Sequence, residues 1–478
     1  MKKSNIGLLG LGITAFSRIS PFYLNDGYQL FCGRATPDLR LLRSIGRIRS
    51  MEEETGHLKE PITSLDLLEY GAFRETILSS RARYLYVYQS YKGLEAILKG
   101  TGKILIANRA ELRESLSTKL SFIRILQELG IEPLKWMQVS SKAFMGLTAK
   151  ELFSSFSGPF VVQVADITRG GGRGLFFVRG EDALSRVREV VGKGVLHRTR
   201  VTELLIRPFV EGISISALGC VTRQGTVIGP LQLQLIDLYG ESPLGEGGIF
   251  CGHSWDRIHR EGLCSQVQKV VRRVGDLLFQ KGYRGMFGID FIGDKERAYP
   301  LELNPRLTGA LPVLTLLQLR DGILPIEFVH ILSFFEEAEF DVEALNSLFQ
   351  RGTEGAHVIL FGDETKEEFY PKTLIPGIYK WESDWARYLG SGYFFPKEEH
   401  EFAILEGPYG SIRPGDEGWD NFLRILRIVF QNPITNANGA LKEWARNVIG
   451  WTRGAILGER GWKISFDHND PALLKQSP

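Results

Sequence analysis

Two carboxylates and an amide lie on neighbouring strand-like runs, 286–292 and 298–304. A polar loop between the runs predicts a β-hairpin. Side chains alternate faces along a strand, so Glu302 and Asn304 share one face, and the hairpin places Asp290 opposite Glu302. Hard oxygen ligands of this kind suit Mg²⁺, which takes the rest of its shell from water and substrate phosphates.

The same hairpin has a simpler interpretation, in which it is half-buried with a polar outer face. Either carboxylate alone would favour that interpretation. The combination of Asp290, Glu302 and Asn304 at the ends of paired apolar strands favours a metal site instead. Arg306 follows directly and could neutralise a phosphoryl group.

A glycine-rich segment, T-R-G-G-G-R-G over 168–174, lies between two strand-like runs. It is not the G-x-x-x-x-G-K-[ST] phosphate loop, which joins a strand to a helix. Glycines let backbone N–H groups approach phosphate oxygens, and Arg169 and Arg173 add positive charge. The segment alone is compatible with a lid over nucleotide phosphates and equally with a plain surface hairpin.

The elements that position these residues predict an α/β beginning. Runs 6–11, 84–87 and 104–107 have the pattern of buried strands, and a glycine turn after the first predicts a helix through Phe16 and Ile19. These glycines read G-x-x-G-x-G, so a tight turn is favoured over a dinucleotide site.

Helices and strands alternate through the middle of the chain. Apolar spacing predicts helices over 117–129, with Lys119 in the first turn, and over 265–282. Further strands are predicted over 159–165, 175–178, 204–210 and 213–218. An acidic stretch at 336–339 suggests a boundary before an α+β remainder.

Composition limits the function classes. The 58 Lys and Arg balance 56 Asp and Glu at a net charge of +2, which gives no case for a nucleic-acid or membrane-surface binder. The four scattered cysteines indicate neither a disulfide framework nor a thiolate zinc site. Lys2 and Lys3 precede an apolar run, but glycines interrupt it, so we expect a cytoplasmic protein rather than a secreted one.

Together the segments resemble the ATP-grasp superfamily, and within it the carboxylate–amine ligases. The likeness runs in family order through Lys119, the lid-like segment 159–178, the stretch 205–216, which is similar to the adenine hinge, and the metal and phosphate motif at 285–309. Residues 234–236 and 248–252 are similar to a substrate-side stretch.

This resemblance implies an α/β (α+β) fold in three parts. A Rossmann-like domain would cover 1–112, and an ATP-grasp domain would cover 113–335 with a lid at about 155–212. A C-terminal α+β extension would cover 336–478.

The resemblance also implies roles for individual residues. Mg²⁺, with Mn²⁺ as an alternative, would be held by Asp290, Glu302 and Asn304. ATP would contact Lys119, Gln163, Arg169, Gly171, Gly172, Arg173, Arg207, Phe209, Val210, Glu211 and Ser214, with Phe209 and Val210 lining an adenine slot. Arg306 and Lys119 would be catalytic, and His253, Thr308 and Gly309 would border the substrate. Thr308 and Gly309 are expected to open the helix that follows, where their backbone N–H groups could bind an anionic group.

Two positions depart from the family pattern. Gln163 stands where the family usually has a lysine that holds phosphates, and Ser214 stands near the position of a glutamate that binds the ribose. Both changes bear on nucleotide affinity more than on the metal chemistry.

The resemblance implies an ATP-dependent ligase that joins a carboxylate to an amine through an acyl phosphate. Amino acids are the expected substrates, and a homodimer is the expected alternative to a monomer. Other readings on the same scaffold are a carboxylase or a phosphotransferase. A catalytically degenerate ATP-binding regulatory protein is a further alternative, and Gln163 and Ser214 are its best support.

Overall fold

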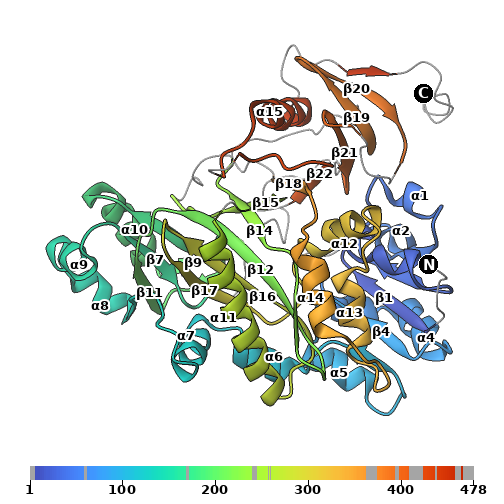
Figure 1. The fold of residues 1–478 in the computed structure, drawn as a ribbon, viewed down its shortest axis with the longest axis horizontal. Helices are drawn as coiled ribbons and strands as arrows, with labels where there is room; N and C mark the ends of the chain where they lie inside the picture. Colours follow the sequence, from blue (N-terminus) through green and yellow to red (C-terminus); the bar gives the residue numbers. More distant parts are fainter. Residues whose placement is uncertain are drawn as a thin grey trace.

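The computed structural model describes residues 6–58, 62–167, 172–238, 245–256, 258, 260–361, 374–392, 398–407, 424–436, 439–457 and 464–466. The fold is mixed α/β and is built on three large sheets, which appear in chain order from blue through green to red (Figure 1). The first sheet is parallel, and the other two are mainly antiparallel.

The first sheet has the strand order β3-β2-β1-β4-β5. Its strands are β1 (Leu8–Gly12), β2 (Gln29–Cys32), β3 (Arg47–Ser50), β4 (Tyr84–Tyr86) and β5 (Ile104–Ile106). The helices around it are α1 (Leu39–Leu42), α2 (Met51–Thr55), α3 (Ser64–Glu69), α4 (Gly71–Ser79), α5 (Lys92–Leu98) and α6 (Ala110–Leu116). Between β1 and β4 the strand order reverses, and the carboxyl ends of such strands open a crevice where ligands bind in α/β sheets.

The single helix predicted after β1 does not form as an α-helix. Two short 3-10 helices, Phe16–Arg18 and Ser20–Tyr23, stand in its place. Pro21 lacks the backbone N–H that a continuing α-helix would use, so the chain turns again there.

The second sheet has the order β6-β11-β7-β8 and lies at the end of the molecule coloured teal in Figure 1. Its strands are β6 (Met137–Ser140), β7 (Phe160–Val164), β8 (Leu175–Val178) and β11 (Glu203–Pro208). Around it are α8 (Ser141–Gly146), α9 (Ala149–Phe156), α10 (Glu181–Gly192) and the ribbon of β9 (Val195–Leu196) and β10 (Thr199–Arg200). Helix α7 (Lys119–Glu128) precedes this sheet but packs into the core of the central sheet described next. One face packs apolar side chains such as Val162 and Ile206 into a core with α10, which leaves Gln163 and Arg207 on the other face.

The central sheet begins with the order β17-β16-β12-β14-β15. Its elements are β12 (Ile213–Val221), β13 (Thr226–Ile228), β14 (Gln232–Ile236), β15 (Phe250–Trp255), α11 (Glu261–Gln280), β16 (Gly285–Gly293), β17 (Ala298–Asn304), α12 (Leu311–Arg320) and α13 (Ile326–Leu332). Helix α11 packs its apolar stripe against one face, including Ile215, Ile289 and Leu303. The opposite face therefore carries Ser216, Asp290 and Glu302.

Strands after residue 336 extend this same sheet. Strand β15 pairs with β18 (Gly355–Phe361), and the order continues β22-β21-β19-β20-β23. The remaining elements are α14 (Val342–Gln350), β19 (Gly377–Glu382), β20 (Trp385–Gly390), β21 (Glu401–Leu405), β22 (Arg424–Phe430), α15 (Glu443–Leu457) and β23 (Ile464–Phe466). The expected C-terminal part is thus joined to the central sheet by backbone hydrogen bonds.

Three helices differ from their predicted bounds. Helix α7 covers Lys119–Glu128 rather than 117–129. Helix α11 begins at Glu261, four residues before the predicted start, because Glu261 to Cys264 already fit its helical pattern. Thr308 and Gly309 were expected to open the next helix, but α12 begins at Leu311. The strands β8 and β17 have the predicted bounds.

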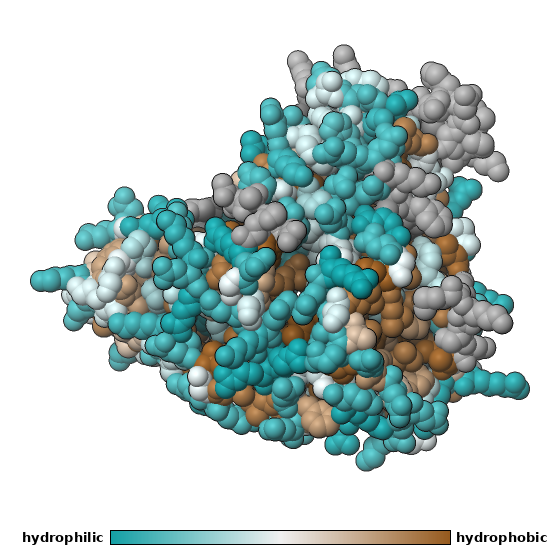
Figure 2. All heavy atoms as spheres, viewed as in Figure 1, coloured by the Kyte–Doolittle hydropathy of each residue, from teal (hydrophilic) through white to brown (hydrophobic). Residues whose placement is uncertain are grey.

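Among the described residues, no helix is both long and apolar enough to span a membrane. Figure 2 shows one face of the molecule covered mostly by hydrophilic residues, with hydrophobic ones visible toward its middle.

Candidate active site

The carboxylate hairpin forms as the sequence predicts. In the register of β16 and β17, Asp290 lies opposite Glu302 and Gly288 lies opposite Asn304. A bulge follows Asp290, so that Phe291 pairs with Pro300. The two carboxylates and the amide therefore share the face of the sheet that α11 leaves free.

A network of polar side chains holds Asp290. Its Oδ2 accepts a hydrogen bond of 3.0 Å from Asn304 Nδ2, and its Oδ1 accepts one of 2.9 Å from Nε2 of Gln234 on β14. Burial, and then the neighbouring Glu302 carboxylate, raise the pKa of Asp290 to about 6. A buried carboxyl whose charge is disfavoured in this way fits a divalent cation, because the cation would offset that charge.

Few side chains at this site could act as metal ligands. The described part of the chain has no group of three or more His, Cys, Asp and Glu side chains that could hold a metal ion. A cation here would depend on the Asp290 and Glu302 carboxylates, on the Asn304 amide oxygen, and on water and phosphate oxygens. That ligand set suits Mg²⁺ better than a softer metal.

Two cations reach this site, one from α7 and one from the second sheet. Lys119, the first residue of α7, places Nζ 3.8 Å from Glu302 Oε2, and its side chain is 12% exposed. Arg207 on β11 donates through Nη1 to the Leu301 carbonyl at 3.1 Å. Burial lowers the Arg207 pKa to about 10, and the Glu302 charge opposes that shift. The face of the second sheet that carries Arg207 is therefore turned toward β17.

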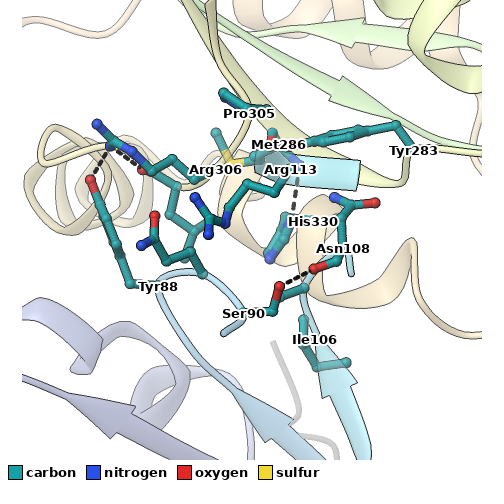
Figure 3. Close-up of a pocket in the computed structure, with 13 residues that line it drawn as sticks. Tyr88, Ser90, Ile106, Asn108, Arg113, Tyr283, Met286, Pro305, Arg306 and His330 are labelled. Atoms are coloured by element: carbon teal, nitrogen blue, oxygen red, sulfur yellow. Dashed lines mark hydrogen bonds between the residues drawn. The ribbon is translucent and has the colours of Figure 1, made fainter. Parts of the chain in front are cut away.

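Arg306 lies on the other side of the hairpin, at the carboxyl end of the first sheet. Its Nη2 donates to Asn304 Oδ1 at 3.1 Å, and its Nη1 donates to the Tyr88 hydroxyl. Figure 3 shows Arg306 and Tyr88 beside a small cavity that Asn108 and His330 also line. A volume of about 10 Å³ suits at most one water molecule, so the cavity is not itself a substrate pocket.

The expected lid is described only in part. Arg169 and Gly171 lie outside the described residues. Gly172 has a φ of +85°, and a Cβ on it would lie 2.3 Å from the Gly248 carbonyl oxygen, so the hairpin passes very close to the loop before β15. Arg173, beside it, is described and half-buried.

Gln163 lies on the face of the second sheet that carries Arg207, opposite Leu205 and Leu175. Phe209, expected to line an adenine slot, makes an edge-to-face contact with Phe177, with ring centroids 5.4 Å apart.

Three further residues of the expected nucleotide set lie along the approach to β12. Val210 is half-buried and Glu211 is exposed. Ser214 lies on β12 opposite Ile292, on the sheet face of Ser216 and Asp290.

The three residues expected to border the substrate differ in their place in the fold. His253 on β15 is buried, with only 4% of its surface exposed, and its ring lies against His357 and Trp255. Thr308 and Gly309 lie in the loop between Arg306 and α12. The Thr308 hydroxyl is buried without a hydrogen-bond partner among the described residues.

The ATP-grasp domain family matches residues 166–310, which include the lid segment, the central strands and the carboxylate hairpin. The chain contains an ATP-grasp domain. ATP and Mg²⁺ are the standard cofactors of ATP-grasp enzymes.

Comparison with curated proteins gives a distant relative. The arginine-specific large chain of carbamoyl phosphate synthase from Geobacillus stearothermophilus is 21% identical over 260 residues, or 54% of this chain. The match spans only 22% of that larger protein.

Solved structures of ATP-grasp enzymes share the fold. The biotin carboxylase domain of the Hydrogenobacter thermophilus 2-oxoglutarate carboxylase, crystallised with MgADP and bicarbonate, is 16% identical, with a TM-score of 0.57 over 89% of this chain and 86% of that one. Phosphoribosylamine–glycine ligase from Thermotoga maritima is 15% identical, with a TM-score of 0.52 over 88% of this chain and 91% of that one. At these identities the likeness shows the fold, including the parts on either side of the ATP-grasp domain.

Two contacts of the site were not predicted, although Gln234 belongs to the stretch 234–236 that resembles a substrate-side segment. Gln234 reaches Asp290 across the intervening strand β12, and Tyr88 reaches Arg306 from the first sheet. The alternation Gln232, Leu233, Gln234 was a signal that two amides share one face of a strand. No signal in the sequence linked Tyr88 to Arg306, because 218 residues separate them.

Proposed function

We propose that this protein is an ATP-dependent carboxylate–amine ligase that makes an amide or peptide bond and releases ADP and phosphate. The observation that carries the proposal is the pairing of Asp290 with Glu302, beside Asn304 and Arg306, within the segment that matches the ATP-grasp domain. Lys119 lies beside Glu302. Amino acids are the proposed substrates, a homodimer is the proposed assembly, and the cytoplasm is the proposed location.

The proposed reaction needs activation because an ionised carboxylate is a poor electrophile. Transfer of the ATP γ-phosphoryl group to the substrate carboxylate makes an acyl phosphate, which the amine attacks with loss of phosphate. Such transfers depend mainly on positioning and on neutralising charge. When bound, Mg²⁺ supplies charge neutralisation at the phosphates, and Asp290, Glu302 and Asn304 are the residues proposed to hold it.

The cationic side chains have separate proposed tasks. Lys119, the first residue of α7, is proposed to contact the ATP phosphates. Arg306, held by Asn304 and Tyr88, is proposed to bind the phosphoryl group of the acyl phosphate. Phe209 is proposed to line the adenine slot, and the segment with Gly172 to cover the phosphates.

The first test measures ADP and phosphate release from Mg-ATP with pooled amino acids and small carboxylates. We expect release that requires both a carboxylate and an amine. We expect Glu302→Ala to lower it by about a hundredfold or more, because an anionic ligand at the centre of the site is lost.

Glu296→Ala is the matched control. It makes the same change on the exposed turn of the same hairpin and should leave release unchanged. Equal ADP release by wild type and Glu302→Ala would contradict the metal assignment.

A second candidate function is a carboxylase that phosphorylates bicarbonate. It is favoured by the TM-score of 0.57 with the biotin carboxylase domain of Hydrogenobacter thermophilus. Bicarbonate in place of the carboxylate pool separates the two functions: release that depends on bicarbonate and not on an amine would favour the carboxylase.

A further inference from the structure

A line of buried polar side chains crosses β15, β18 and β22. His253 Nδ1 lies 3.1 Å from His357 Nε2, and His357 Nδ1 lies 2.9 Å from Arg427 Nη1. Arg427 in turn donates through Nε to Glu406 at 2.9 Å. Each of these four residues is at most 4% exposed. We call them the histidine relay.

The relay fixes the tautomers of both histidines. Arg427 has only donors, so the His357 Nδ1 that faces it must be an unprotonated acceptor. The hydrogen of neutral His357 is then on Nε2, and it is donated to His253 Nδ1. Neutral His253 must therefore carry its own hydrogen on Nε2.

The relay lies on the face of the sheet that carries the metal carboxylates. His253 is directly opposite Gln234 in the register of β14 and β15, and Gln234 donates to Asp290. Opposed residues of an antiparallel pair point to the same side of a sheet. The far end of the relay also adjoins the site, because Arg427 donates to the carbonyl of Gly309 at 3.3 Å, three residues after Arg306.

Several polar atoms at and around His253 have no hydrogen-bond partner among the described residues. Nε2 is the ring atom farthest from the backbone, and none of the described residues forms a hydrogen bond to it. On the same face, the Gln232 carboxamide and the Trp255 indole nitrogen are buried without partners among the described residues. Buried polar groups are normally satisfied, so an unpaired group of this kind needs a partner such as water or a ligand.

We propose that His253 is a catalytic hydrogen-bond donor whose Nε2–H binds an oxygen of the substrate's reacting acyl group, and that His357 and Arg427 are positioning residues that fix its tautomer. This proposal rests on the ligase function proposed above. The nucleotide side of the site, with Lys119 and Arg207, lies toward β17, whereas His253 lies beyond β14 on the opposite side of Asp290.

The donor stays neutral at working pH. Burial, and then the Arg427 charge, lower the pKa of His253 to about 3. The same causes, together with the other histidine, hold the pKa of His357 well below its usual range. A neutral donor can bind an acyl oxygen without adding a full charge to the substrate side of the site.

The first experiment determines the tautomer directly. The full chain, labelled with ¹⁵N in its eight histidines, is studied by long-range ¹H–¹⁵N correlation, and His253→Gln identifies the His253 signal. We expect a single neutral Nε2–H tautomer for His253 at pH 7. His357→Leu should abolish this preference. His357→Gln should restore it, because the carboxamide can accept from Arg427 and donate to His253.

His330→Gln is the matched control. His330 is a second buried histidine, and it accepts a hydrogen bond from the Met286 backbone outside the relay. Its replacement should leave the His253 signal unchanged. An Nδ1–H tautomer of His253 in the wild type, or no effect of His357→Leu on the tautomer, would overturn the proposal.

The second experiment asks whether His253 meets the reacting group. Acetyl phosphate, a simple acyl phosphate, is added to the protein with Mg-ADP. We expect the Nε2–H signal to shift, and His253→Ala to weaken acetyl phosphate binding by about tenfold, with unchanged Mg-ADP affinity. Binding of acetyl phosphate with no shift and no effect of His253→Ala would overturn the catalytic role.

Neither experiment depends on turnover. Failure of ADP release with every pool would count against the ligase function. A wrong tautomer, or an unmoved His253 signal, would count against His253 alone.

Discussion

Gln163 is an uncharged residue at a position where the family usually has a lysine that holds phosphates. It lies on β7, on the same face of the second sheet as Arg207, and this face is turned toward β17. We expect Gln163→Lys to tighten Mg-ATP binding by about tenfold, because a cation there would face the phosphates in a partly desolvated site. Calorimetric titration with Mg-ATP measures the change.

Gln163→Met serves as the control, since it keeps the length of the side chain without adding charge. We expect it to leave nucleotide affinity within about threefold of the wild type, since the uncharged amide contributes little. If Gln163→Lys binds Mg-ATP no more tightly than Gln163→Met, then Gln163 does not face the phosphates.

At this scale, the sequence could predict pairs that one hairpin brings together. Asp290 and Glu302 are 12 positions apart, and strand periodicity alone places them opposite each other. Gln234 and Tyr88 could not be found in this way, because their contacts with Asp290 and Arg306 depend on the order of strands in a sheet and on the packing of two sheets. His357 and Arg427 are in a part of the chain whose sequence carries no recognisable pattern.

At the scale of elements, the close passage of the lid hairpin over the loop before β15 is the tightest constraint. Gly172 has a φ of +85°, and a Cβ at this position would overlap with the Gly248 carbonyl oxygen. We expect Gly172→Ala to shift the hairpin and to raise the Kd for Mg-ATP by about tenfold or more, since both left-handed strain and a backbone clash oppose the change.

The control for this prediction separates strain from contact. Gly100→Ala imposes similar strain, at a φ of +78°, but no atom lies within 4 Å of its Cβ. It should lower the melting temperature slightly and leave the Kd for Mg-ATP unchanged. Equal Kd values for Gly172→Ala and the wild type would show that this contact does not position the lid over the nucleotide.

The bounds of an element were predictable where the side-chain pattern agrees with the flanking polar residues and prolines. Strand β17 matches its predicted range, since polar residues precede it and Pro305 follows its last residue. The start of α12 was not predictable, because it depends on the loop that carries Arg306. In this loop the Gly309 carbonyl accepts a hydrogen bond from a buried arginine 118 residues away. Short 3-10 helices such as Phe16–Arg18 have the composition of a helix but too few residues to show its period.

For the whole molecule, buried histidines give stability a dependence on pH. Burial is the main cause that lowers the pKa of His253 and of His330 to about 3, and that of His357 well below its usual range. In the unfolded chain a histidine has a pKa of about 6.5. Acidification below this value protonates the unfolded state and not the folded one, so the folded state loses stability as the pH falls.

We therefore expect the free energy of unfolding to fall between pH 7 and pH 5 by about 2 kcal/mol for each of these histidines. Urea titrations at the two values measure it. His330→Gln should remove about one third of the change that the three produce. His57→Gln, at an exposed histidine, should not alter it. An unchanged pH dependence in His330→Gln would show that His330 takes up a proton in the folded protein.

The continuity of the central sheet has a consequence for how this protein can be produced in parts. Residues 252–255 of β15 pair with residues 355–358 of β18, so a shortened chain ending near residue 335 would lose that partner strand. Strand β15, with the sequence F-C-G-H-S-W, would then be a bare edge without a charged residue or a proline to discourage pairing with other chains. An isolated ATP-grasp domain cut at this boundary would tend to aggregate, and its insolubility would say nothing about whether the catalytic part can fold.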